Sequence, residues 1–171
     1  MDFQFNNIFL ITSLFVLVLC IIHTIITDFK SLIISNKTVI SIIVLFFIGS
    51  LVNPDVENNF YYILLSSFFI FLFFFIFFVL GFVGGGDVKL VTAISLWLGP
   101  SLLFEFLLYM SLAGGILALV KVSLLRMKNN RMLKVLGENT HNFFNSKEIP
   151  YGLAIGFSAL IMIPAIYNNH I

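Results

Sequence analysis

Long apolar stretches separated by short polar breaks run along nearly the whole chain. A helix needs roughly 17 to 25 apolar residues to cross a bilayer core about 30 Å thick. We therefore predict an all-α, polytopic integral membrane protein with about six transmembrane helices, folded as a single domain over residues 1–171. The windows that meet this length requirement, or come close to it, are residues 8–26, 37–52, 59–82, 88–103, 107–122 and 150–167.

The composition excludes the common soluble classes. Sixty per cent of the residues are hydrophobic and 10% are charged, whereas a soluble domain carries roughly 25% charged residues. A net charge of +1 provides no broad basic field, so we expect membrane lipid and no nucleic acid as a partner. The single cysteine, Cys20, excludes an internal disulfide, and the three histidines are scattered. We therefore expect neither a metal nor a cofactor.

The basic residues lie on one side of the predicted topology. All nine Lys and Arg fall in or beside the connections 27–36, 83–87 and 123–149, and the connections on the other side have none. The positive-inside rule then places this side at the cytoplasm and both termini outside. No Lys or Arg precedes Lys30, so we interpret the first span as a retained helix and not as a signal peptide. The polar segment 123–149 suits either a helix on the anionic leaflet or a solvated loop.

Two acidic residues lie near the edge of the predicted membrane spans. Placing an ionisable side chain there costs free energy, so such a residue usually has a function. Asp28 ends the first predicted span, and Asp87 follows three glycines just before the fourth. The topology derived from Lys and Arg places both at the cytoplasmic side, although 59 positions separate them in the sequence. We therefore predict that folding brings their carboxyl groups together.

Paired carboxyl groups have a well-defined chemistry. Near neutral pH such a pair can hold one shared proton. One member takes a proton from water while the other donates to a peptide carbonyl oxygen, which is general acid and base catalysis without a covalent intermediate. Glycines before Asp87 let a substrate strand approach the backbone closely. On these residues alone, an ordinary interfacial acid and a flexible glycine break explain the pattern equally well.

Three motifs resemble those of the type IV prepilin peptidases, which are polytopic aspartic proteases of the bacterial inner membrane. Residues 84–90, GGGDVKL, resemble the family signature G-x-G-D-x-K-[LF]. Asp28, with Asn36 eight residues later, resembles the family's first aspartate and the I-P-N motif that follows it. Residues 150–152, PYG, resemble the P-[FY]-G opening of the last helix.

The resemblance implies a reaction and a set of site residues. The reaction is cleavage of the short, basic leader of prepilin-like proteins at the cytoplasmic membrane boundary. Asp28 and Asp87 correspond to the catalytic dyad. The positions that correspond to supporting residues are Gly84, Gly86, Lys89, Asn36, Pro150 and Gly152.

The chain also departs from the family pattern. Ser35 occupies the place usually held by proline, which loosens the turn after Asp28 because proline fixes φ near −65°. The long bifunctional members carry two C-x-x-C pairs and also methylate the new terminus. With one cysteine, this chain resembles the short, peptidase-only form, so we do not expect methylation.

Three rival interpretations remain open on the sequence alone, and one of them is a purely structural membrane subunit. Presenilin-like and signal-peptide-peptidase-like proteases also use G-x-G-D, but their Tyr-Asp and Pro-Ala-Leu motifs lack counterparts, since Thr27 precedes Asp28 and Tyr151 follows Pro150. A small proton-coupled transporter could use the two aspartates as a relay. Such a transporter favours paired halves with helices broken at matching positions, and the sequence has no internal repeat.

Overall fold

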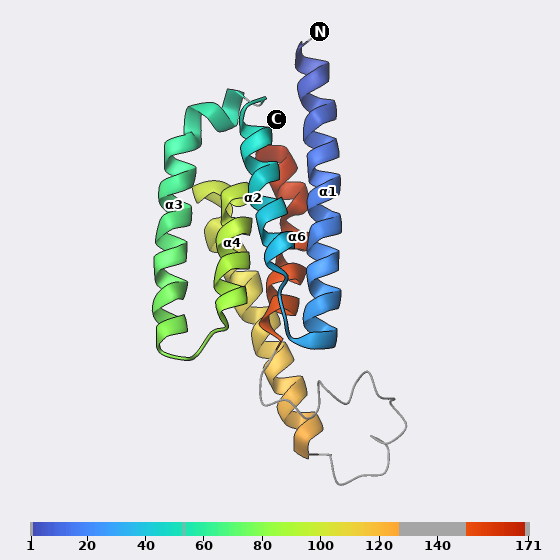
Figure 1. The fold of residues 1–171 in the computed structure, drawn as a ribbon, viewed down its shortest axis with the longest axis vertical. Helices are drawn as coiled ribbons and strands as arrows, with labels where there is room; N and C mark the ends of the chain where they lie inside the picture. The colour runs from blue at the N-terminus through green and yellow to red at the C-terminus, as the bar shows by residue number, and fades with distance from the viewer. Residues whose placement is uncertain (1, 53, 127–149, 170–171) are drawn as a thin grey trace.

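The computed structural model describes residues 2–52, 54–126 and 150–169, and these residues form five helices with no strand among them (Figure 1). The all-α prediction is confirmed. The predicted polar segment 123–149 lies almost entirely outside the described residues. In chain order the helices are α1 (Asp2–Ser31), α2 (Asn36–Ser50), α3 (Pro54–Val79), α4 (Gly85–Arg126) and α6 (Tyr151–Asn169).

Four of the described helices are long and apolar enough to cross a membrane, and α2 is apolar but shorter. Large apolar side chains cover their outer faces, as the exposed Phe15 on α1 and Phe68 on α3 illustrate. Such exposed apolar faces suit contact with lipid. The long stretches are Asn7–Ser31, Asn59–Val79, Gly85–Ser123 and Tyr151–Asn168. The count of six spans stays a prediction.

The helix α4 changes direction at Gly99. The backbone there has φ 62° and ψ 177°, a region open essentially to glycine alone, and the following Pro100 has no N–H to donate. Figure 1 shows residues 85–98 rising from the start of α4 and residues 100–126 running back down past it. The sequence predicts two short helices over 88–103 and 107–122 that turn near Gly99, Pro100 and Glu105, and the turn at Gly99 and Pro100 is confirmed. The second arm begins earlier than its predicted bound, so Glu105 lies within it.

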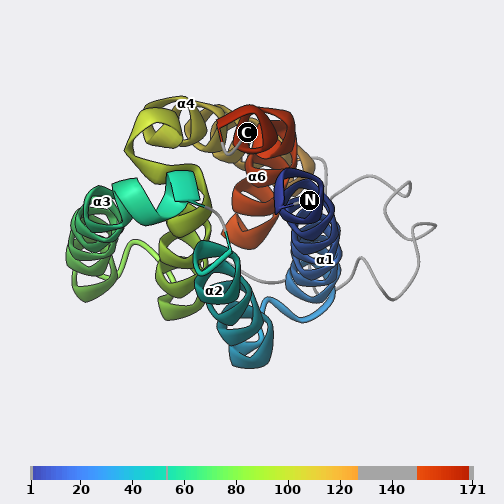
Figure 2. The same ribbon diagram turned by 90° about the horizontal axis from the view of Figure 1, so that it is seen from above.

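The helix α6 contacts two other helices of the bundle. Seen along the bundle, it sits between α1 and α4 (Figure 2), and it contacts both. Gly156 allows the close approach to α1, since a Cβ at this position would lie 2.5 Å from Cγ1 of Ile25. Fully buried apolar side chains from these three helices fill the space between them, among them Leu17, Ile21, Ile94, Leu98, Ile155 and Met162.

The ends of three helices meet at the end of the bundle opposite the chain termini. In Figure 1 the last turns of α1, the start of α4 and the start of α6 lie together at the lower end, and N and C lie at the upper end. Asp28 lies near the end of α1, and Asp87 lies at the start of α4. The fold therefore brings both aspartates to the same end, as predicted.

We expect Gly99→Ala to destabilise the protein by about 1 to 3 kcal/mol, because a residue with a Cβ is strained at this φ and ψ. A steric clash does not contribute to this destabilisation, since a Cβ at Gly99 would lie 3.6 Å from Cγ1 of Ile63, an ordinary contact distance. Thermal unfolding of the purified protein in detergent measures the effect. Gly115→Ala is the matched control on the same helix, because nothing lies within 4 Å of its new Cβ. Equal unfolding midpoints for the two variants would contradict the bend assigned to Gly99.

Candidate active site

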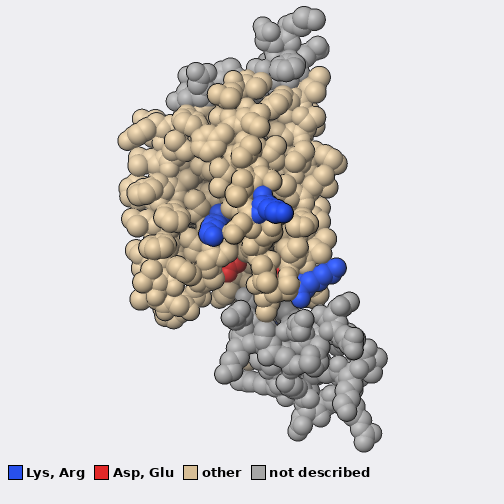
Figure 3. All heavy atoms as spheres, in the orientation of Figure 1, with Lys and Arg blue, Asp and Glu red and all other residues tan. Residues whose placement is uncertain are grey.

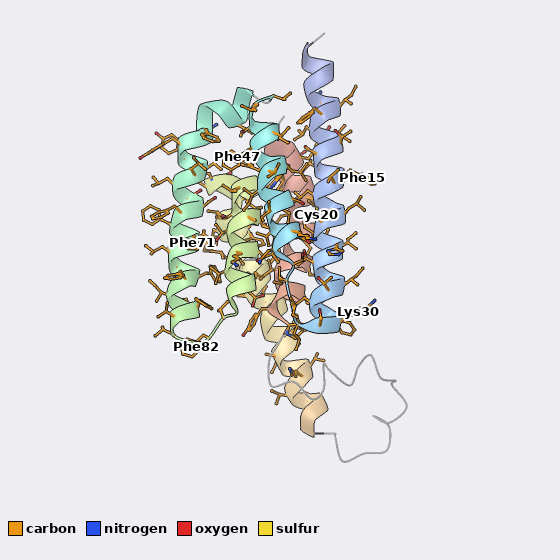
Figure 4. The ribbon with its side chains drawn as sticks, viewed as in Figure 1. Phe15, Cys20, Lys30, Phe47, Phe71 and Phe82 are labelled. Atoms are coloured by element: carbon orange, nitrogen blue, oxygen red, sulfur yellow. The ribbon has the colours of Figure 1, made fainter. Side chains whose placement is uncertain are left out.

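A cavity of about 640 Å³ opens at the end of the bundle where α1, α4 and α6 meet. Asp28 and Asp87 both line it, together with residues of the two connections, 32–34 and 81–84. In Figure 3 acidic atoms reach the surface near positive side chains on the lower half of the visible face. Lys30 and Phe82 mark this end of the bundle in Figure 4. The two aspartates therefore face one shared space.

Asp28 is held by the start of α6. Its side chain is only 4% exposed, and its Oδ2 accepts a hydrogen bond from the backbone N–H of Leu153 at 3.2 Å. Leu153 lies in the first turn of α6, so the positive end of this helix dipole faces the carboxyl group. The same N–H also donates to the carbonyl oxygen of Pro150, at 3.2 Å. The position of the Asp28 carboxyl group is thus set by a second helix.

Gly152 leaves the room that this arrangement needs. A Cβ at position 152 would lie 2.7 Å from both Cγ and Oδ2 of Asp28, closer than real side chains approach. Pro150 is buried directly before α6, where it starts the helix without requiring a partner for a backbone N–H. The P-Y-G motif therefore has a structural reason in this fold, which is to bring a helix start against the buried aspartate.

Asp87 lies in the first turn of α4, not before the helix as predicted, and its side chain is half-buried. The carbonyl oxygen of Gly84 accepts a hydrogen bond from the backbone N–H of Val88 at 3.2 Å. A Cβ on Gly84 would lie 3.0 Å from Oδ2 of Asp87, and a Cβ on Gly86 would lie 3.1 Å from Cβ of Ile34. The first glycine leaves room for the carboxyl group, and the second lets the α1–α2 connection pack against α4.

Lys89 and Asn36 join two walls of the cavity. The Nζ of Lys89 donates a hydrogen bond to Oδ1 of Asn36 at 3.2 Å. Both side chains are exposed and line the cavity, one from the first turns of α4 and the other from the first residue of α2. This contact connects the start of α2 with the start of α4.

All eight residues predicted for the site lie around the two aspartates. Six of them line the cavity, and Pro150 and Gly152 support Asp28 at the start of α6. Tyr151 also lines the cavity and was missed, although it lies inside the P-Y-G motif. The N–H donor of Leu153 was missed because a backbone group leaves no signal in the residue type. Within the described part of the chain, no group of three or more His, Cys, Asp or Glu could hold a metal ion.

Comparison with known proteins gives one match. The model of the type IV leader peptidase family matches residues 14–119, which is more than half of the chain. The matched region contains Asp28, Asp87 and the glycines before Asp87, and it ends before the P-Y-G motif. Comparisons with curated proteins and with solved structures gave no match. The coverage of the family match shows that this chain belongs to the type IV leader peptidase family.

Proposed function

We propose that the chain is a prepilin leader peptidase, an aspartic endopeptidase that removes the short, basic leader of type IV prepilin-like proteins. One observation carries this proposal. Asp28 on α1 and Asp87 on α4, far apart in the sequence, line the same cavity. Membership of the leader peptidase family favours a protease over a proton-coupled transporter.

In the proposed reaction a water molecule is bound between the two carboxyl groups. One carboxylate takes a proton from this water as its oxygen attacks the peptide carbonyl carbon, and the other carboxyl group donates a proton to the carbonyl oxygen. The tetrahedral intermediate then collapses, and the leaving amine accepts a proton. The chain forms no covalent bond to the substrate in any step.

The surroundings of the two aspartates give them different tasks. Asp28 is buried and its carboxyl group is held by the N–H of Leu153, so it provides a fixed point for the water. Asp87 is more accessible and follows the three glycines, where no side chain stands between the cavity and the backbone. We therefore place the substrate backbone along residues 84–86, next to Asp87.

We further propose that the cavity faces the cytoplasmic side of the bacterial inner membrane, with both termini outside. Lys30, Lys37 and Lys89 are exposed and lie on the helix ends that surround the cavity. Lysines at one end of a membrane bundle favour the cytoplasmic leaflet, where they contact anionic lipid headgroups. A cavity at this end is accessible to a leader peptide that has not crossed the membrane.

We expect Asp28→Asn and Asp87→Asn each to lower cleavage of a prepilin-like substrate by at least about 100-fold, because each removes one partner of the acid and base pair. The substitutions are nearly isosteric, so the protein should still insert and accumulate. The measurement is the mass shift of the substrate when the leader is lost. Glu105→Gln is the control, since this acid is exposed on α4 and does not line the cavity. Retained cleavage in either aspartate variant would reject the dyad.

We expect Gly152→Ala to reduce cleavage by on the order of 100-fold, because the new Cβ displaces the carboxyl group of Asp28 and small displacements at a reacting centre have effects of this size. Gly114→Ala is the matched control. It is a buried glycine on α4 next to Tyr151, and its new Cβ would lie 3.6 Å from Cε1 of that residue, an ordinary contact. Equal kcat/KM for the two variants would show that α6 does not position Asp28.

A further inference from the structure

Tyr151 is the middle residue of the P-Y-G motif, and the packing described above gives its side chain no task. Pro150 starts α6, and Gly152 leaves room for the carboxyl group of Asp28. The family motif P-[FY]-G also contains phenylalanine at the middle position, and tyrosine differs from phenylalanine by one hydroxyl group, which can donate a hydrogen bond. The hydroxyl group is therefore the feature of this residue that needs an explanation.

Tyr151 lies beside both aspartates. It is the first residue of α6, and the next residue, Gly152, lies directly against the carboxyl group of Asp28. Tyr151 lines the 640 Å³ cavity together with Asp28 and Asp87. It also lines a second, apolar cavity of about 360 Å³, again together with Asp87. The side chain therefore belongs to the wall at which the two cavities meet.

The ring of Tyr151 is packed, but its hydroxyl group is available. The ring lies on the second arm of α4, where a Cβ at Gly114 would meet Cε1 at 3.6 Å, an ordinary contact. The hydroxyl group makes no hydrogen bond to any residue in the described part of the chain. Two other side chains with N–H donors line the polar cavity, Asn36 and Lys89, and they are bonded to each other.

We propose that Tyr151 is a third catalytic residue, whose hydroxyl group donates a hydrogen bond to the oxygen of the peptide carbonyl group as negative charge develops on it. This inference rests on the proposed function. The oxygen has two lone pairs, so it can accept this hydrogen bond as well as the proton from a carboxyl group. Tyrosine forms no covalent bond to the substrate and keeps its own proton throughout.

The surroundings of the aspartates favour tyrosine for this task. The N–H of Leu153 already donates to Asp28 and to the carbonyl oxygen of Pro150, so it is not available to the reacting oxygen. Tyr151 also adjoins the apolar cavity, and a hydrogen bond to a charged oxygen is stronger where the surroundings are less polar. A donor that is already in place stabilises the charged transition state more than it stabilises the uncharged substrate.

The test compares Tyr151→Phe with the unchanged chain, both purified at full length in detergent, on a prepilin-like substrate. Loss of one donor of this kind lowers kcat by roughly 100-fold to 1000-fold in a well-studied protease. We expect kcat to fall at least about tenfold and KM to change less than about twofold, because the hydrogen bond strengthens in the transition state. The variant keeps the ring that packs on α4, so it should fold. Tyr62→Phe is the control, since Tyr62 is exposed on α3 and lines neither cavity.

A second measurement separates transition-state stabilisation from a structural role. A substrate analogue with a fluorinated ketone in place of the cleaved carbonyl group binds as the hydrate, which imitates the tetrahedral intermediate. We expect Tyr151→Phe to weaken binding of this analogue by the same factor by which it lowers kcat/KM. Binding of the released leader peptide, which lacks the tetrahedral centre, should stay unchanged.

Each result distinguishes the role of Tyr151 from the proposed function. A lower kcat with a matching loss of analogue affinity supports the catalytic hydroxyl group. Equal kcat in Tyr151→Phe and the unchanged chain overturns it and leaves the peptidase proposal intact. A higher KM at constant kcat, or a lower kcat without the loss of analogue affinity, also overturns it. No cleavage by the unchanged chain overturns the proposed function together with this inference.

Discussion

The close approach of α6 to α1 holds the candidate site together. Two glycines on α6 permit it, because a Cβ at Gly156 would meet Ile25 and a Cβ at Gly152 would meet Asp28. Helices in a membrane gain little from hydrophobic burial against one another, so small residues that allow close packing are a main source of their association. Here the same contact that packs the helices also delivers the Leu153 N–H to the buried carboxyl group.

A buried acid within a candidate membrane span requires compensation, and the fold provides it with backbone groups. Asp28 meets an N–H and the positive end of a helix dipole, and Asp87 lies in the first turn of its own helix. The donor to Asp28 comes from a helix start, where the first N–H groups have no partner within the helix. Both carboxyl groups thus lie at the positive end of a helix dipole.

The bundle and the meeting of the two aspartates could be predicted from the sequence, because span lengths and the distribution of Lys and Arg decide which helix ends lie together. The residues around Asp87 could be placed because residues 84–90 resemble the family signature. The turn near Gly99 and Pro100 could be predicted from these two residue types, but the exact start of the fifth span could not, since hydropathy is similar on both sides of Gly99. The second, apolar cavity beside the candidate active site could not be predicted, because Phe74, Met110 and Ile155, which line it, come from separate helices and only packing brings them together.

Asp28 and Asp87 face one space at one end of the bundle, and chemical cross-linking tests this arrangement. Cysteines are placed at positions 28 and 87 after Cys20→Ala, and a short reagent that reacts with two thiols is added to membranes. We expect a link between residues 28 and 87, identified by mass spectrometry. A control pair at positions 51 and 87 should form no link, because position 51 follows the opposite end of α2. Two cysteines at 28 and 87 that each react with a single-headed reagent and yet never link would contradict the account.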